Sequence, residues 1–498
     1  MAARKIAHPS VDDRKAKGLQ ARDQVPLSSH AQWNPAADHP DPVALLEGQD
    51  KTREPDLVPV RHGRMMVSPL SFYRGAATVM AADLAPTPVA GLEVQLCGDA
   101  HLLNFGLFAS PERLLLFDVN DFDETLPGPF EYDVKRMAAS FTVAGRNNGF
   151  AKADIRAATL ASVRAYREAM ADFAQMGAMD IWYARLDKDE LMATIRRVVA
   201  ETKKETKKAK KAKKAKENKA EKKDEKDEQL AKKAERRAEK IAGKARRHDS
   251  LQALSKLGEQ VDGGYRIVSQ PPLVVPLRDL AGTYGLSADE AEHSIRDQFR
   301  AYSETLDDDR RHLLKQFEII DAARKVVGVG SVGTRCFIVL LQGRDAADPL
   351  FLQVKEATKS VLEPYVGKSR YRQPGERVVQ GQRMMQAASD VYLGWTKGVD
   401  VRRYFYWRQL RDMKGSVDIE TLLPLGLTSY ARMCGWTLAR AHARSGDPVA
   451  IAEYLGGTDA FDKSITGFSQ AYADQNERDH QEFVNAVKAG RLTAVEGV

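Results

Sequence analysis

The stretch CGDAHLLNFG constrains the fold of this chain more than any other feature. It places Asp99 and Asn104 five residues apart, and three further acids follow a strand-like run, at Asp118, Asp121 and Asp123. Phosphoryl-transfer sites combine an acid that accepts a proton with amide and carboxylate oxygens that hold Mg²⁺. The spacing therefore predicts a catalytic loop with Asp99 as the base. Asn104 is a candidate metal ligand, together with Asp118 or Asp121.

A second motif lies more than 200 residues later, in VVGVGSVGTRCFIVLL. Gly328, Gly330 and Gly333 form the pattern G-x-G-x-x-G. A dinucleotide-binding fingerprint needs a strand before the glycines and a helix after them. Here we expect a helix before and a β-branched strand after, an order that indicates a kinase-type glycine-rich loop lying over ATP phosphates.

The apolar strand FLQVKEA carries Lys355, 22 residues after Gly333. A buried ammonium group is costly without an anionic partner. We expect ATP phosphates and Glu376, near the start of the next helix, to be that partner, with Glu363 as the alternative. The alternative interpretation is that Lys355 has no anionic partner and extends its ammonium group to solvent at a strand edge. The later stretch QLRD has the character of a hinge, so we expect the adenine near Leu410.

The overall charge of +7 could suggest a nucleic-acid-binding protein, but its distribution argues against this. Residues 201–250 hold 17 Lys and 4 Arg against 8 Glu and 3 Asp, a net charge of +10. The remaining chain therefore carries −3. This insertion lacks an apolar seam, so it cannot pack as a coiled coil. We expect a solvated helical or disordered segment, and the alternative is a tether to nucleic acid or an acidic surface.

Several classes of protein are excluded by composition. The chain is 43% hydrophobic and 29% charged, which is typical of a globular protein. Three separated cysteines, no apolar leader and no run of about 20 apolar residues predict a cytoplasmic protein without a membrane span. The ten histidines include no His-x-His pair, which disfavours a metallophosphoesterase.

The pattern of elements predicts an α+β fold in which helix-rich and strand-rich regions are segregated. We expect strands at GTRCFIVLLQG, PLFLQVKEA, DVYLGWTKG and RRYFYWRQLRD, and a long helix from about Leu427 to Ala443. The predicted divisions are an N-terminal arm (1–65), a first helical region with the catalytic loop (66–200), the insertion (201–250), a helical connection (251–325), a β-rich lobe (326–412) and the last helices (413–498).

The motif C-G-D-A-H-L-L-N, followed by NDFDETLPGPFEYDVKR, resembles the aminoglycoside and choline phosphotransferases of the protein-kinase-like superfamily. Their pattern is H-G-D-x-H-x-x-N, then a strand ending in an Asp-led turn, then an Asp that opens a helix. Cys97 stands where that family has His. The resemblance implies that Asp121 is the metal ligand. It also implies that Asp133 is structural and holds the catalytic-loop backbone by hydrogen bonds.

Over most of residues 12–480 the chain resembles an uncharacterised bacterial family, domain of unknown function 2252. FYRGAATVMAADLA, CGDAHLLNFG, FDVNDFDET, VVQGQRMMQAASDVYLGW and RQLRDMKGS carry this resemblance. That family is assigned to the kinase-like superfamily, so the resemblance implies a two-lobed kinase-like fold. It brings no established substrate.

The order of the motifs is the reverse of that in kinase-like chains, where the glycine loop and lysine come first. We therefore expect a circularly permuted fold. Permutation costs little when the cut lies in a surface connection. It predicts that Asp99, Asp121 and Lys355 converge on one cleft.

The function that these residues favour is ATP- and Mg²⁺-dependent phosphotransfer. The H-G-D-like loop and the missing A-P-E segment favour a small-molecule acceptor, with a hydroxyl or amine group, over a protein. The same residues also suit AMP transfer, with the nucleotide bound in reverse. A third hypothesis is a nucleotide-binding pseudokinase or scaffold. The sequence does not indicate the oligomeric state.

Overall fold

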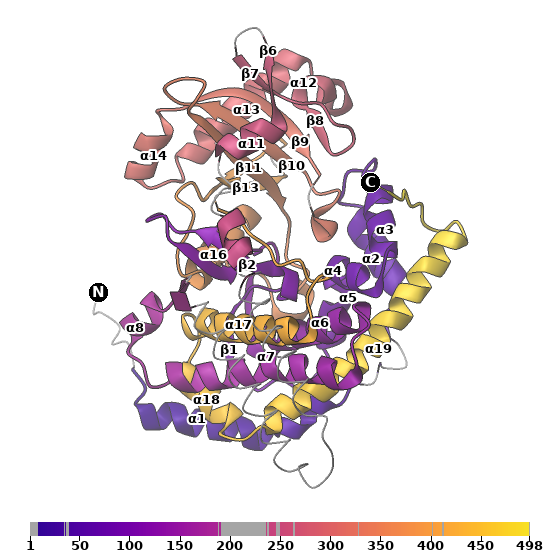
Figure 1. Ribbon diagram of the computed structural model, residues 1–498, viewed down its shortest axis with the longest axis vertical. Coiled ribbons are helices and arrows are strands. Elements are labelled where there is room, and N and C mark those ends of the chain that lie inside the picture. The colour runs from indigo at the N-terminus through magenta and orange to yellow at the C-terminus, as the bar shows by residue number, and fades with distance from the viewer. Residues whose placement is uncertain are drawn as a thin grey trace.

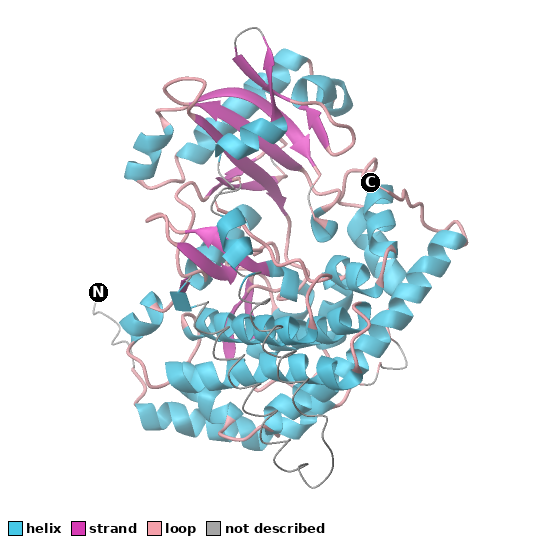
Figure 2. Ribbon diagram, in the orientation of Figure 1, coloured by secondary structure: helices cyan, strands magenta, loops and turns pink. Residues whose placement is uncertain are grey.

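The computed structural model describes residues 8–497 except 34, 36–38, 188, 191–235, 237–238, 246–249, 262–263, 327, 401 and 411–412. The described chain is a mixture of helix and sheet, as expected for an α+β fold (Figures 1 and 2). Most of the predicted insertion 201–250 lies outside the described residues. The packed chain resumes before residue 250, since Ala242 and Ala245 are buried in the main hydrophobic core.

One antiparallel sheet of six strands lies at one end of the molecule (Figure 1). In spatial order its strands are β12 (Gly394–Lys397), β13 (Tyr404–Gln409), β11 (Pro349–Ala357), β10 (Cys336–Gln342), β9 (Glu318–Lys325) and β8 (Val274–Pro276). The hairpin of β10 and β11 confirms the prediction from two apolar runs, and it pairs Cys336 with Lys355.

Both faces of this sheet are buried, because successive side chains of a strand point to opposite sides. Val339 and Leu341 of β10 pack with Tyr302 of α13 (Ala288–Ser303), on one face. Ile338 and Leu340 pack on the other face, against α11 (Ser250–Leu257). The continuous apolar sequence of β10 follows from this two-sided burial.

The helix expected before the glycine motif is partly wrong. Helices α13 and α14 (Asp308–Leu314) form as expected, but the next residues, EIIDAARK, form strand β9. Alanine, glutamate and lysine favour helices in isolation. Here pairing with β8 and β10 on either side outweighs that preference. The glycine motif thus connects two neighbouring antiparallel strands.

The opposite end of the molecule is helical (Figure 1). Its central helices are α6 (Phe130–Asn147), α7 (Lys152–Phe173), α17 (Pro424–Ala443), α18 (Pro448–Leu455) and α19 (Ala460–Lys488). The helix predicted to end at Ala443 is confirmed as α17, which packs along α7. Close approach of the two helices requires Gly435, because a Cβ there would lie 2.1 Å from the Ser162 carbonyl oxygen.

The N-terminal region lies along these helices. Its elements are α1 (Val11–Gln24), α2 (Pro42–Asp50), α3 (Val58–Met66), α4 (Pro69–Gly75) and α5 (Ala77–Leu84). Helix α1 packs on α18, and α2 packs on α19. The segment between α2 and α3 reaches the glycine motif, where the Glu54 N–H donates to the Gly333 carbonyl at 2.7 Å.

Two small sheets connect the helical region to the large sheet. One pairs β1 (Glu93–Leu96) with β4 (Leu126–Pro129), and the other contains β2 (Phe105–Ala109), β3 (Leu115–Val119) and β5 (Leu186–Asp187). The remaining short elements are α8 (Ala178–Tyr183), β6 (Gly258–Val261), β7 (Gly264–Ile267), α12 (Leu277–Leu280), α15 (Glu363–Val366) and α16 (Pro374–Met385). The loop after β1 and the loop after β3 therefore lie between the two ends of the molecule.

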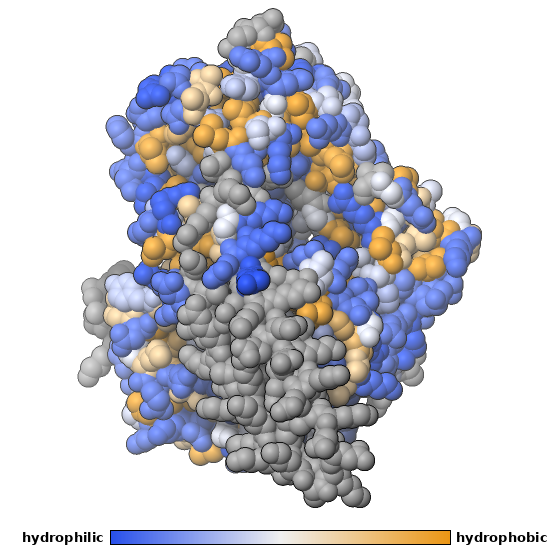
Figure 3. All heavy atoms as spheres, in the orientation of Figure 1, coloured by the Kyte–Doolittle hydropathy of each residue, from blue (hydrophilic) through white to orange (hydrophobic). Residues whose placement is uncertain are grey.

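Hydrophilic residues cover much of the described surface on the face shown in Figure 3, and apolar residues are interspersed among them. Within the part of the chain that the structure describes, no helix has both the length and the apolarity that a membrane crossing requires.

Candidate active site

A cavity of about 430 Å³ lies where the large sheet meets the loops after β1 and β3. It is lined by residues from both halves of the chain. Of the residues predicted from the sequence, the cavity lining includes Asp99, Asn104, Asp121, Gly328, Gly330, Lys355 and Leu410. Gly333 and Glu376 are not part of the lining.

The loop after β1 is held by the first turn of α6, as predicted for Asp133. Its carboxylate accepts hydrogen bonds from the backbone N–H groups of Cys97, at 2.7 Å, and Gly98, at 3.0 Å. Gly98 adopts a positive φ of 83°, and a Cβ there would lie 2.3 Å from the Glu124 carbonyl oxygen. A glycine is therefore required where this loop turns toward the cavity.

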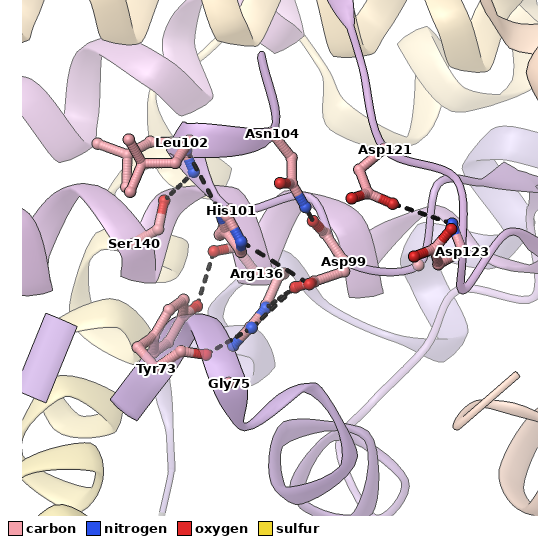
Figure 4. Close-up of polar contacts among 12 residues, drawn as sticks. Tyr73, Gly75, Asp99, His101, Leu102, Asn104, Asp121, Asp123, Arg136 and Ser140 are labelled. Atoms are coloured by element: carbon pink, nitrogen blue, oxygen red, sulfur yellow. Dashed lines mark hydrogen bonds and ion pairs between the residues drawn. The ribbon is translucent and has the colours of Figure 1, made fainter. Parts of the chain in front are cut away.

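Asp99 faces the cavity with one oxygen held by an arginine (Figure 4). Arg136 Nε donates to Asp99 Oδ1 at 2.8 Å, and His101 Nε2 lies 3.8 Å from Oδ2. Burial raises the pKa of Asp99, although Arg136 opposes this. Burial and the positive charge of Arg136 lower the pKa of His101 well below its ordinary value, so His101 is neutral. The second oxygen of Asp99, Oδ2, therefore lies near the neutral imidazole of His101.

Asn104 connects this loop to the loop after β3. Its side-chain amide donates to the Asp99 backbone carbonyl at 2.7 Å (Figure 4), and the Asn120 N–H donates to the Asn104 carbonyl at 2.8 Å. Because the amide nitrogen is engaged with the loop, the amide oxygen is the atom that remains for a ligand.

Lys355 lies between two carboxylates of the loop after β3. Its Nζ is 2.5 Å from Asp123 Oδ2 and 3.9 Å from Asp121 Oδ2, and Tyr406 donates to Asp123 Oδ1 at 2.6 Å. Burial opposes ionisation of Asp123, but Lys355 and Tyr406 outweigh it and lower its pKa. Burial and the charge of Asp123 raise the pKa of Asp121.

The structure therefore supplies a different partner for Lys355 from the one that the sequence suggested. Asp123 pairs with it, whereas the expected partners were Glu376 or Glu363. Helix α16 instead sends Arg377 inward, where its guanidinium donates to the carbonyl oxygens of Thr125 and Asp123. Through these hydrogen bonds, the Arg377 side chain of α16 supports the backbone of the acidic loop after β3.

Asp118, the other candidate metal ligand, is buried away from the cavity lining. It accepts a hydrogen bond from Arg440 and one from the Ala387 N–H at 2.8 Å. Because both oxygens are engaged by protein donors, its role in this structure is to join β3 to α17 and to the chain after α16.

The cavity residues without a role assigned from the sequence include Arg53, Arg74, Asp123 and Glu124. Asp123 and Glu124 belong to the acidic run that was noted, so their positions carried a signal. Burial raises the pKa of Glu124 to about 7, and its Oε2 accepts from the Val361 N–H at 2.7 Å. Arg74 lies in the stretch FYRGAATVMAADLA, whereas Arg53 lies in none of the stretches singled out from the sequence. Tertiary packing brings both to the cavity.

The cavity lining contains oxygen donors of the kind that bind Mg²⁺. No group of three or more His, Cys, Asp or Glu suited to a metal ion occurs in the described residues. Mg²⁺ keeps several waters and binds one or two carboxylates together with substrate phosphates. Asp121 and the Asn104 oxygen, both in the cavity lining, fit that limited requirement.

Comparison with known proteins finds one family. The model of the family described as "Uncharacterized protein conserved in bacteria (DUF2252)" matches residues 53–229 and 210–486. Comparisons with curated proteins and with solved structures gave no significant match. Since the matched segments cover most of its length, the chain belongs to this family of uncharacterised bacterial proteins.

Proposed function

We propose that this protein is an ATP- and Mg²⁺-dependent phosphotransferase that acts on a hydroxyl or amine group of a small molecule. The observation that carries the proposal is the convergence of two distant motifs. Asp99 and Asp121 line the same cavity as Lys355, from which they are separated by more than 200 residues. A coincidental polar turn would have no reason to lie against the glycine segment and the buried lysine.

The order of elements in the large sheet supports a kinase-like, circularly permuted arrangement. Strand β9, the glycine segment, β10 and β11 with Lys355 are followed by α16, β12 and β13. In kinases a glycine-rich loop covers the phosphates and the lysine stands on the third strand. One feature departs from that pattern, since Lys355 pairs with Asp123 and not with a glutamate of α16.

Each residue then has a role in the transfer. The acceptor oxygen or nitrogen forms a bond to the terminal phosphorus, the bond from that phosphorus to the bridging oxygen breaks, and ADP leaves with the electron pair. Asp99 accepts the proton of the acceptor through Oδ2, while Arg136 fixes the carboxylate through Oδ1. Bound Mg²⁺ would neutralise phosphate charge, with Asp121 and Asn104 as its protein ligands.

The test is thermal unfolding with ATP, with and without Mg²⁺, followed by turnover. We expect ATP with Mg²⁺ to stabilise the wild type, and Asp121→Asn and Lys355→Ala to weaken that effect. Asp99→Asn should bind nucleotide and lose transfer. Asp172→Asn, an exposed aspartate of α7, is the matched control. No stabilisation by any nucleotide would refute the proposal.

The group transferred is tested separately. ATP labelled at the γ-phosphate should label the product, and ATP labelled at the α-phosphate should not. If the product instead carries label from the α-phosphate, the site transfers AMP and not a phosphoryl group. Unchanged cellular function in Asp99→Asn would instead favour a binding protein.

A further inference from the structure

Two arginines from outside the large sheet enter the cavity. Arg53 lies between α2 and α3, and Arg74 lies on α4. Both belong to the N-terminal region, from which no residue has a role in the proposed phosphotransfer. Their guanidinium groups are cationic features of the cavity to which the proposed function gives no role.

Arg53 is buried with unused hydrogen-bonding capacity. It is 7% exposed, its Nη1 donates to the Val332 carbonyl, and its Nε has no hydrogen-bond partner. The nearest acid is Asp50, 3.8 Å from Nε. Asp50 is already engaged, since Arg61 donates to Oδ1 at 2.8 Å and His62 Nε2 lies 2.8 Å from Oδ2. The cluster therefore keeps a surplus positive charge beside the cavity.

Arg74 is half-buried and also lies against the glycine segment. Its Nε is buried and has no hydrogen-bond partner. Burial lowers its pKa, and the charge of Asp99 opposes that effect, which places the guanidinium within electrostatic reach of Asp99. For Arg53, burial and the charge of Arg61 lower the pKa to about 9. An anion bound between the two arginines would relieve this cost.

The glycine segment rests directly on both arginines. A Cβ at Gly333, whose φ is 85°, would lie 3.1 Å from Arg53 Cβ, and one at Gly330 would lie 3.2 Å from the Arg74 carbonyl oxygen. Val332 is fully buried against α3. The segment expected to cover phosphates thus packs against the Arg53 side chain and the Arg74 backbone, and both arginines line the same cavity. A guanidinium binds phosphate oxygens well, because it matches them with paired donors.

We propose that Arg53 and Arg74 form a subsite for the terminal phosphate of a nucleoside triphosphate, an inference that rests on the proposed function. Lys355 is already paired with Asp123, so part of its charge is neutralised before a nucleotide binds. Both arginines line the same cavity as Asp99, Asp123 and Glu124. The terminal phosphate is the one that must reach this position for transfer.

The experiment compares the dissociation constants of ATP and ADP, each with Mg²⁺, for the full chain. Arg53→Ala and Arg74→Ala should weaken ATP binding roughly 10- to 100-fold, as for loss of a hydrogen bond to a charged group, and leave ADP binding within about twofold. Arg53→Lys keeps the charge, fits the same space and should show an intermediate loss. Arg296→Ala, an exposed arginine of α13, removes the same charge elsewhere and should change neither constant.

Equal weakening of ATP and ADP, or no weakening of either, would overturn the subsite and leave the phosphotransferase proposal standing. If the alanine variants do not fold, Arg53→Lys provides the test. A change in the ratio of its ATP and ADP dissociation constants would support the subsite, and an unchanged ratio would overturn it. If the wild type binds neither nucleotide, the proposed function fails and the subsite fails with it.

Discussion

Replacing Lys355 by methionine tests the arrangement of charges on which the site depends. Methionine keeps an unbranched side chain of similar length and removes the ammonium group. The substitution leaves Asp123 and Asp121 without the cation that now lies 2.5 and 3.9 Å from them. Two neighbouring carboxylates would then repel each other at the edge of the cavity.

The magnitude follows from the exposure of the three groups. Breaking a fully buried ion pair costs about 3–5 kcal/mol. The Lys355 side chain is 3% exposed, but those of Asp121 and Asp123 are 32% and 28% exposed, so water screens part of the repulsion. We therefore expect a loss of roughly 1–3 kcal/mol in the free energy of unfolding near neutral pH.

The dependence on pH has a definite sign. Lys355 and Tyr406 hold the pKa of Asp123 below its ordinary value of 3.8 in the folded protein. This contribution is present above about pH 4 and is lost as the pH falls through the folded pKa. The difference in stability between wild type and Lys355→Met should therefore shrink below pH 4.

The assay is urea unfolding at a series of pH values, with and without Mg²⁺. Mg²⁺ should stabilise Lys355→Met more than the wild type, because it replaces the missing cation between the two carboxylates. Lys359→Met, which removes an exposed lysine outside the cavity lining, is the matched control. A Lys355→Met protein with wild-type stability and wild-type Mg²⁺ response would refute this arrangement of charges around Lys355.

Two further substitutions test the packing and the buried charges of the helical region. Gly435→Ala should destabilise the protein by about 1–3 kcal/mol or more in urea unfolding, because the new Cβ would lie 2.1 Å from the Ser162 carbonyl oxygen of α7, whereas Gly457→Ala has open space and should be neutral. Burial raises the pKa of Asp479 to about 7, so its charge destabilises the fold increasingly from about pH 4 to pH 7. Asp479→Asn should therefore be more stable than wild type at pH 8, by up to about 1.4 kcal/mol for each pH unit by which the pKa is raised, and similar to it at pH 4. The control Glu482→Gln, at an exposed position, should show no such trend. If the stability of Asp479→Asn depends on pH as that of the wild type does, Asp479 does not carry a destabilising buried charge.

Local pattern was sufficient for elements whose burial is uniform along their length. The hairpin of β10 and β11 was predictable because both strands are buried on two faces and read as apolar runs. Strand β9 was not, because its outer residues are exposed and its buried ones are Ala322, Ala323 and Arg324. Its pairing with the neighbouring strands β8 and β10, and not its own residue pattern, decides its conformation.

The same distinction separates the site residues that were predicted from those that were not. Asp99 and Asn104 lie in one loop, so their spacing alone carried the prediction, whereas the structural role of Asp133 was implied by the family resemblance. The partner of Lys355 depends on which loop folds against β11. The sequence indicated Glu376 or Glu363, whereas Asp123 is the partner in the structure. Arg53 reaches the cavity only because α2 and α3 pack beside the glycine segment, and no local pattern encodes that.

A single backbone contact explains why the order of the motifs along the chain does not prevent them from meeting. The chain that leaves β13 returns to β2, where the Leu107 N–H donates to the Gly415 carbonyl at 2.7 Å and the Gly415 N–H donates to the Leu107 carbonyl at 3.0 Å. A Cβ at Gly106 would lie 2.7 Å from the Gly415 carbonyl oxygen, so the approach depends on glycine. Strand β2 begins directly after Asn104. The chain at Gly415 and the strand that follows Asn104 are therefore neighbours through main-chain pairing, although they lie far apart in the sequence.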